Sequence, residues 1–127
     1  MDGASFRKWT EQDPNVTFSQ CVRHLLKENG MTAAKLARES RLSKTTISRA
    51  LRDSDDRGAT YRPNEKMVIA ISIALKLGLD GYEALREIAF PELIVMENGL
   101  KEKKSVDEVN DELYELGLPL LANTDDE

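Results

Sequence analysis

A short run near the middle of the chain carries polar and basic side chains at helical spacing. Residues 43–51 predict a helix whose inward side is apolar, formed by Ile47, Ala50 and Leu51. The side chains that point away from it are Lys44, Thr45, Ser48, Arg49 and Arg52. Lysine and arginine donate hydrogen bonds, so this outer face suits a ligand rich in acceptors. The competing interpretation is that each basic residue is a solvated surface charge.

The only histidine and the only cysteine offer little for catalysis. His24 lies beside Leu25 and Leu26 with no paired serine, cysteine or carboxylate motif, which favours a structural role. Cys21 cannot form an internal disulfide, and one cysteine with one histidine argues against a structural zinc site. We therefore expect no enzyme activity, no metal and no cofactor.

Three predicted helices would position the polar face. The first begins at about Thr17 and ends at Gly30. The second is capped by Thr32 and ends near Ser40, and the third is capped by Ser43. Two short helices joined by a tight turn, the second polar and basic on its outer face, are what reading a DNA major groove requires.

Two further helices are expected after an exposed loop at residues 53–63. Residues 64–78 are apolar on nearly every side, which predicts a helix buried at the centre. Asp80 and Glu83 form a capping-box pattern that starts the next helix, which ends near Phe90. The chain is therefore expected to be all-α.

The C-terminal third is more polar. Residues 92–97 suit either a short helix or a strand, closed by Asn98 and Gly99, and the pattern leaves both open. A capping box at Ser105 opens a last helix, which precedes an acidic tail at residues 123–127. The apolar stripe of this helix is either a dimer seam or a face that docks on the chain itself, and consists of Val106, Val109, Leu113 and Leu116.

These patterns divide the chain into three parts. Residues 1–17 are expected to be an N-terminal arm without a helical stripe, residues 18–89 a helical domain, and residues 90–127 a helical extension with an acidic tail. No run is long and apolar enough for a membrane span, and the start lacks the apolar segment of a signal peptide. A cytoplasmic location is expected.

Charge is unevenly distributed. The formal net charge is -5, which by itself argues against nucleic acid. Residues 18–62, however, hold ten basic side chains against five acidic ones, whereas residues 100–127 hold three against nine. Such asymmetry suggests a basic binding surface with an acidic flank.

The stretch from residue 31 to 51 resembles the helix-turn-helix of the phage repressor and Cro-type family, also called XRE-like. The residues that carry the resemblance are Leu36, Ala37, Leu42, Ile47, Ser48 and Arg49. Pro63 before an apolar helix, then Leu77-Gly78-Leu79 and a short final helix, is similar to the rest of the family domain. Over residues 18–89 the resemblance implies a five-helix, lambda-repressor-like helix-turn-helix domain, followed here by a C-terminal helical extension.

The resemblance also implies roles for individual side chains. Contacts to base edges would come from Lys44, Thr45, Ser48 and Arg49. Contacts to phosphates are expected from Thr32, Ser43, Arg52, Arg57, Thr60, Tyr61 and Arg62. The chemistry agrees, because arginine and lysine pair well with guanine and a free helix N-terminus offers backbone N–H groups to a phosphate oxygen.

The sequence departs from the family pattern in two ways. Arg41 occupies a turn position often held by glycine, and a positive φ there would cost about 1 kcal/mol. Leu26 and Leu51 stand where some family members keep a buried Arg and Glu pair. Such an apolar pair would simply pack, so neither change alters the outward-facing surface.

Two functions from different classes fit these observations. The first is a sequence-specific, double-stranded DNA-binding transcriptional regulator, expected to be a repressor that acts as a homodimer. The second is an antitoxin-like or accessory protein-interaction module whose acidic C-terminal region binds a protein partner. The basic side chains discriminate between them: convergence on one face favours DNA, and acidic side chains interrupting that face favour the interaction module.

Overall fold

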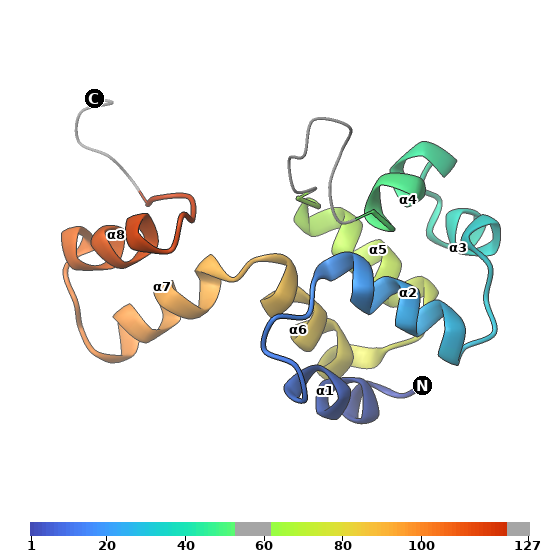
Figure 1. The fold of residues 1–127 in the computed structure, drawn as a ribbon, viewed down its shortest axis with the longest axis horizontal. Coiled ribbons are helices and arrows are strands. Elements are labelled where there is room, and N and C mark those ends of the chain that lie inside the picture. The colour runs from blue at the N-terminus through green and yellow to red at the C-terminus, as the bar shows by residue number, and fades with distance from the viewer. Residues whose placement is uncertain (53–61, 122–127) are drawn as a thin grey trace. The chain divides into compact units, whose positions relative to one another are not determined.

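The computed structural model describes residues 1–52 and 62–121, and within these ranges the chain contains eight helices and no strand (Figure 1). The all-α prediction is therefore confirmed. The helices are α1 (Gly3–Glu11), α2 (Phe18–Glu28), α3 (Ala33–Ser40), α4 (Lys44–Ala50), α5 (Glu65–Ala74), α6 (Gly78–Ala89), α7 (Glu92–Lys101) and α8 (Val106–Glu115). The chain divides into two compact units, residues 1–89 and residues 90–127.

Side-chain caps start the helices around the polar face. Thr32 and Ser43 accept hydrogen bonds from the backbone N–H groups of Lys35 and Thr46, at 3.1 and 3.0 Å. Each bond satisfies a donor that the first turn of a helix leaves unpaired. Thr17 caps α2 in the same way. Local sequence therefore sets where α2, α3 and α4 begin.

Most of the core of the first unit is formed by the apolar faces of α2 to α6. Its fully buried side chains include Val22, Leu25, Leu36, Ile47, Val68, Ile71 and Leu85. Burying a side chain of this size stabilises the fold by roughly 1.5–3 kcal/mol. Packing on this core therefore stabilises α3 and α4, which are too short to be stable as isolated helices.

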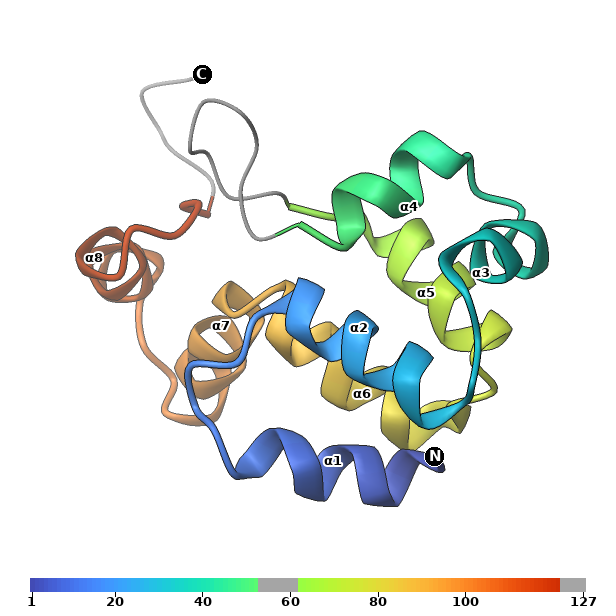
Figure 2. The ribbon, with the colours of Figure 1, turned by 45° about the vertical axis from the view of Figure 1, so that its right-hand side comes forward.

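The N-terminal segment is not the arm that the sequence predicts. Residues 3–11 form α1, which lies alongside α6 (Figure 2). Phe6 is fully buried, and the ring of Trp9 stacks on that of His24 with centroids 3.9 Å apart. A Cβ atom on Gly3 would lie 2.5 Å from the backbone nitrogen of Gly81, so the two helix backbones touch. The buried face of α1 includes a glycine, which gives no apolar signal in the sequence.

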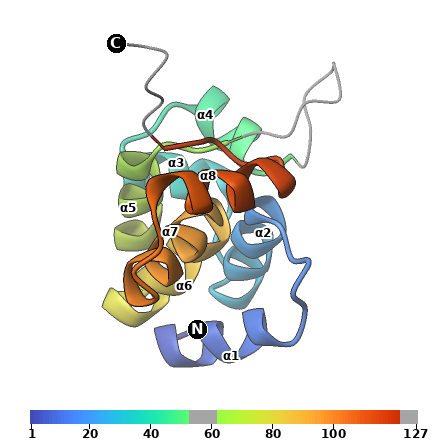
Figure 3. The same ribbon diagram turned by 90° about the vertical axis from the view of Figure 1, so that its left-hand side faces the viewer.

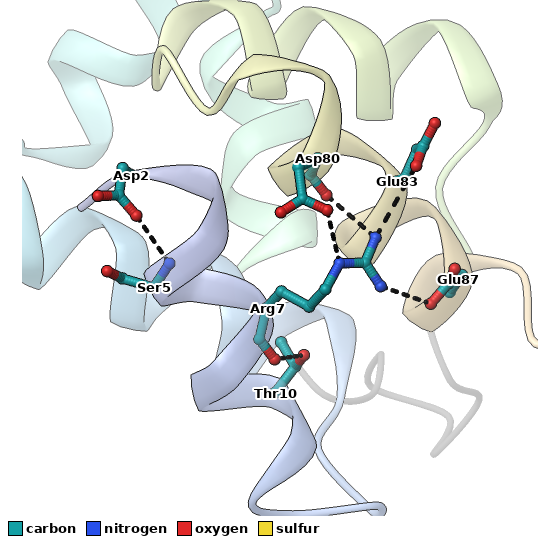
Figure 4. Close-up of polar contacts among 7 residues, drawn as sticks. All are labelled: Asp2, Ser5, Arg7, Thr10, Asp80, Glu83 and Glu87. Carbon is teal, nitrogen blue, oxygen red and sulfur yellow. Dashed lines mark hydrogen bonds and ion pairs between the residues drawn. The ribbon is translucent and has the colours of Figure 1, made fainter.

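Polar contacts also hold α1 on α6. The Arg7 guanidinium lies 2.7 Å from Asp80, 4.0 Å from Glu83 and 3.5 Å from Glu87 (Figure 4). The hydrogen bond with Asp80 raises the pKa of Arg7. The spacing of Asp80 and Glu83 predicts that Asp80 caps α6, and this prediction is wrong. α6 begins at Gly78, before Asp80, and the Asp80 carboxylate binds Arg7 of α1.

The helix expected over residues 64–78 is shorter and less buried than predicted. α5 ends at Ala74, and the chain reverses through Lys76 and Gly78, both with positive φ, at 55° and 73°. Ile73 is 71% exposed and Ile69 is 39% exposed. α5 is consequently buried on one side only, with an apolar strip left on the other.

The second unit is a helical hairpin of α7 and α8 (Figure 1). Residues 92–97 are helical, and α7 continues through Asn98 and Gly99, where the sequence predicted its end. A Cβ on Gly99 would meet the side chain of Val109, so glycine permits close packing here. Lys104 forms ion pairs with Glu102 and Glu112, which fastens the start of α8.

Candidate nucleic-acid interface

A left-handed residue makes the turn between α3 and α4. Arg41 has φ 63° and ψ 19°, the conformation that favours glycine at a helix C-terminus. The buried hydroxyl of Ser40 accepts a hydrogen bond from the Leu42 N–H at 3.3 Å and donates one to the Ala37 carbonyl at 3.4 Å. These contacts fix the angle at which α4 leaves α3.

The inner face of α4 packs into the core. Ile47 is 1% exposed, and Ala50 is completely buried. Leu36 of α3 is also completely buried, so both helices of the pair are anchored. Leu26 is buried and Leu51 half-buried, consistent with the apolar packing expected of them.

The outer face of α4 presents the five polar side chains identified in the sequence. Lys44, Thr45, Ser48, Arg49 and Arg52 are all exposed. At 100° per residue, the four of these residues that lie within α4 fall within an arc of about 140° on its surface, and Arg52 follows two residues after the helix ends. The Arg52 guanidinium donates to the Ser48 hydroxyl at 3.4 Å. The structure therefore brings the predicted base-contacting residues together on one face.

This face carries no negative charge of its own. Residues 44–52 contain no aspartate or glutamate. Among the described residues, no salt bridge joins Lys44, Arg49 or Arg52 to a carboxylate. Arg7 and Lys104, by contrast, each contact at least two carboxylates. Basic side chains that converge on one face without acidic ones are the pattern that, on the sequence alone, favours DNA over the protein-interaction module.

The candidate phosphate-contacting residues differ in whether their hydroxyl groups can still donate a hydrogen bond. Thr32 is exposed and its hydroxyl oxygen accepts the Lys35 N–H, while within the described ranges its O–H donates to no group. Ser43 instead donates its O–H to the Thr46 hydroxyl at 2.8 Å, in addition to accepting the Thr46 N–H. Thr32 therefore keeps a donor for a phosphate oxygen and Ser43 does not. The sequence analysis overlooked Thr46, although its Ser-x-x-Thr spacing could have indicated this contact.

The other candidates lie in or beside the segment that follows α4. Arg62 is exposed, directly before the buried Pro63. Arg57, Thr60 and Tyr61 lie outside the described residues.

The stripe predicted on α8 divides between two environments. Val109 and Leu113 are buried, at 4% and 0% exposed. Val106 and Leu116 are 53% and 64% exposed. Half of the stripe is therefore buried in the single chain, with Val109 against Gly99 of α7, and cannot also serve as an open dimer seam.

Three observations bear on other classes of site. Across residues 1–52 and 62–121, no group of three or more histidine, cysteine and acidic side chains could hold a metal ion. None of the helices in these ranges is long and apolar enough to cross a membrane. Comparison with protein-family models, curated proteins and solved structures gives no match in any of the three. The function is accordingly argued from the geometry and charge of the chain itself.

Proposed function

We propose that the protein is a sequence-specific double-stranded DNA-binding regulator, expected to be a repressor, that reads the major groove with α4. The observation that carries this proposal is the outer face of α4, where Lys44, Arg49 and Arg52 are exposed together without an acidic partner among the described residues. In this proposal α2 to α6 form the five-helix, repressor-like domain, and α1 and the second unit are additions to it.

The proposed recognition follows from the chemistry of each side chain. Lys44 and Arg49 donate to the O6 and N7 acceptors of guanine, while Thr45 and Ser48 contact neighbouring base edges. The Thr32 hydroxyl and the first N–H groups of α3 bind a phosphate on one side of the groove. Arg52 and Arg62 bind phosphates on the other side, and these contacts position the helix without specifying sequence.

One α4 helix of seven residues reads only a few base pairs. Two copies related by a two-fold axis, with their α4 helices about 34 Å apart, would read an inverted repeat on one face of the duplex. A homodimer is therefore part of the proposal, because it supplies both affinity and site recognition.

The test is enrichment of DNA fragments. Wild-type protein is incubated with a library of random duplexes at two salt concentrations, and bound fragments are sequenced. The double variant Lys44→Ala, Arg49→Ala is compared with the control Lys8→Ala, Lys27→Ala, which removes the same charge from exposed positions on α1 and α2. Figure 3 shows α1 at the opposite end of the first unit from α4.

The proposal predicts that the wild type and the control variant both enrich a short inverted repeat, and that the α4 double variant does not. Each base contact contributes about 1–3 kcal/mol, so losing two weakens specific binding by roughly a hundredfold or more. Higher salt weakens both the wild type and the control. Binding that is equally strong in the two double variants would show that α4 is not the reading helix.

A second candidate function rests on the charge of the other unit. Residues 90–127 hold three basic and eleven acidic side chains, and Leu100, Tyr114 and Leu116 are exposed among them. An antitoxin-like or accessory module would use such a surface to bind a basic protein partner. Absence of any enriched sequence in the library experiment would favour this candidate.

A further inference from the structure

The turn that joins α3 to α4 contains an arginine in a backbone conformation that favours glycine. Arg41 has φ 63° and ψ 19°, a left-handed conformation that is strained for a residue with a side chain and unstrained for glycine. The chain has glycine in this conformation after α2 and α8, and lysine after α5 and α7. Strain alone therefore does not mark a site, and the surroundings of each side chain must decide.

The Arg41 side chain makes no specific contact in the part of the chain that the structure describes. It is exposed, and its guanidinium forms neither a hydrogen bond nor an ion pair with any residue of that part. Residues 40–52 contain no acidic side chain and four basic ones, those of Arg41, Lys44, Arg49 and Arg52. Arg41 therefore extends the basic run of α4 into the turn.

The backbone at Arg41 is held on both sides. The Ser40 hydroxyl donates to the Ala37 carbonyl and accepts from the Leu42 N–H, and the Arg41 N–H donates to the Arg38 carbonyl at 3.3 Å. A side chain on a fixed backbone loses less conformational entropy when it binds a ligand than one on a loose loop. The start of the Arg41 side chain is thus positioned before any ligand arrives.

Arg41 lies beside the end of α4 that carries Lys44, which the proposed function places on a base edge in the major groove. The Cα atoms of these two residues, three positions apart, are separated by at most about 11 Å. The major groove is about 12 Å wide, and the sugar–phosphate strands form its edges. Arg41 would consequently lie close to one strand. A guanidinium suits this ligand, because its planar fork of donors matches two oxygens of a phosphate.

We propose that the Arg41 guanidinium binds a phosphate of the DNA backbone beside the N-terminal end of α4. The inference rests on the DNA-binding part of the proposed function and adds a residue to it. The side chain of this residue strengthens binding, whereas its backbone conformation weakens the fold. The contact positions α4 without specifying sequence, so it acts on any duplex.

Replacement by glycine separates these two effects. Arg41→Gly removes the cation and relieves the strain, whereas Arg41→Lys keeps both a cation and the strain. Lys76→Gly is the matched control, because Lys76 is exposed, has φ 55° and follows the last turn of α5 as Arg41 follows that of α3. The two glycine variants therefore make the same change in net charge, in backbone strain and in interaction with a helix dipole.

Fluorescence anisotropy of the full chain measures binding to two labelled duplexes of equal length. One carries the repeat that the wild type enriches, and the other has an unrelated sequence. Only Arg41→Gly should weaken binding, by about tenfold on each duplex at low salt, as expected for the loss of one charge-assisted hydrogen bond. Its slope of log K against log salt concentration should be shallower than that of the wild type by about 0.9, the contribution of one phosphate contact.

The remaining variants should behave differently. Arg41→Lys should keep the wild-type slope because it keeps the charge. Urea denaturation should show that Arg41→Gly and Lys76→Gly both unfold at a higher urea concentration than the wild type. Arg41→Gly would then be a more stable protein that binds DNA more weakly, a combination that loss of structure cannot produce.

Equal affinities of Arg41→Gly and Lys76→Gly, whether both unchanged or both reduced, would overturn the contact. A loss confined to the enriched repeat, with an unchanged salt slope, would place Arg41 on a base edge and overturn the phosphate contact equally. Failure of sequence-specific regulation looks different, since the wild type then enriches no repeat, and a tenfold loss on the unrelated duplex would still support the Arg41 contact. A wild-type chain that binds no duplex would overturn both proposals.

Discussion

Replacing Gly3 by alanine should destabilise the protein, contrary to what helix propensity predicts. Gly3 lies in the first turn of α1, and alanine in place of glycine within a helix usually stabilises it by up to about 1 kcal/mol. Here the added Cβ would lie 2.5 Å from both the Gly81 nitrogen and the Leu77 carbonyl oxygen. Both are backbone atoms, so neither can rotate away. Helix α1 must shift or detach from α6.

The stability lost in Gly3→Ala cannot exceed the free energy that docking of α1 on α6 contributes. Detachment exposes Phe6, whose full burial stabilises the fold by roughly 1.5–3 kcal/mol. It also breaks the Arg7 ion pairs, whose partners are about half exposed and which together add about 1 kcal/mol at most. The loss should therefore reach a limit of about 2–4 kcal/mol. Adding Phe6→Ala to Gly3→Ala should change stability little further, because α1 is already detached.

Urea denaturation measures the free energy of unfolding, and the emission of Trp9 reports docking. Trp9 is the only tryptophan and stacks on His24, so its fluorescence in native buffer should change when α1 leaves α2 and α6. The control Ala4→Ser adds one atom to the exposed side of the same turn and should have little effect. Equal or greater stability of Gly3→Ala with unchanged Trp9 emission would refute the close contact. Additive losses in the double variant would refute the detachment.

Three further predictions address single residues. Arg41→Gly should stabilise the first unit by about 1 kcal/mol in urea denaturation because it relieves a positive φ, whereas Arg38→Gly, within α3, should destabilise it by a similar amount; equal effects would contradict the turn geometry. Burial raises the pKa of Cys21 to about 12, from 9.0 for a free thiol. At pH 8 the thiol should therefore react with Ellman's reagent only as fast as the protein unfolds. The stability that the protonated thiol contributes should fall only above pH 9, where the thiol of the unfolded chain ionises. Hydrogen bonds from Ser5 lower the pKa of Asp2 below 3.8, so the cap of α1 is complete above that pH and is lost as the pH falls further. Acid should consequently change Trp9 emission less in Asp2→Asn, and identical titrations of the two proteins would show that the cap does not hold α1.

The parts of the fold that the sequence predicts are those with local causes. Thr32, Ser43 and Ser105 cap helices because each side chain reaches an N–H group three residues later. The outward position of Lys44 and Arg49 follows from helical spacing relative to Ile47. Each of these features depends only on residues a few positions apart, so it can be predicted from one amino-acid sequence.

The features that the sequence misses depend on distant partners. Asp80 has the spacing of a helix cap, but Arg7, 73 positions earlier, binds its carboxylate. Gly3 and Gly81 touch because neither has a side chain, and such a contact leaves no apolar periodicity. Ile73 reads as core because an apolar run predicts burial without indicating which element covers each side.

Among the described residues, some cations pair with carboxylates and those of the α4 face do not. Arg7, Arg86 and Lys104 pair with carboxylates across or between helices, and each pair fastens one element to another. Arg49 on α4 and Arg52, three residues later and just beyond the end of the helix, have no such partner among the described residues. Like charges at about this spacing repel by a few tenths of a kcal/mol. This repulsion does not assist folding, and a polyanion laid along α4 would relieve it. This unrelieved repulsion supports our proposal that α4 is the helix that would contact DNA.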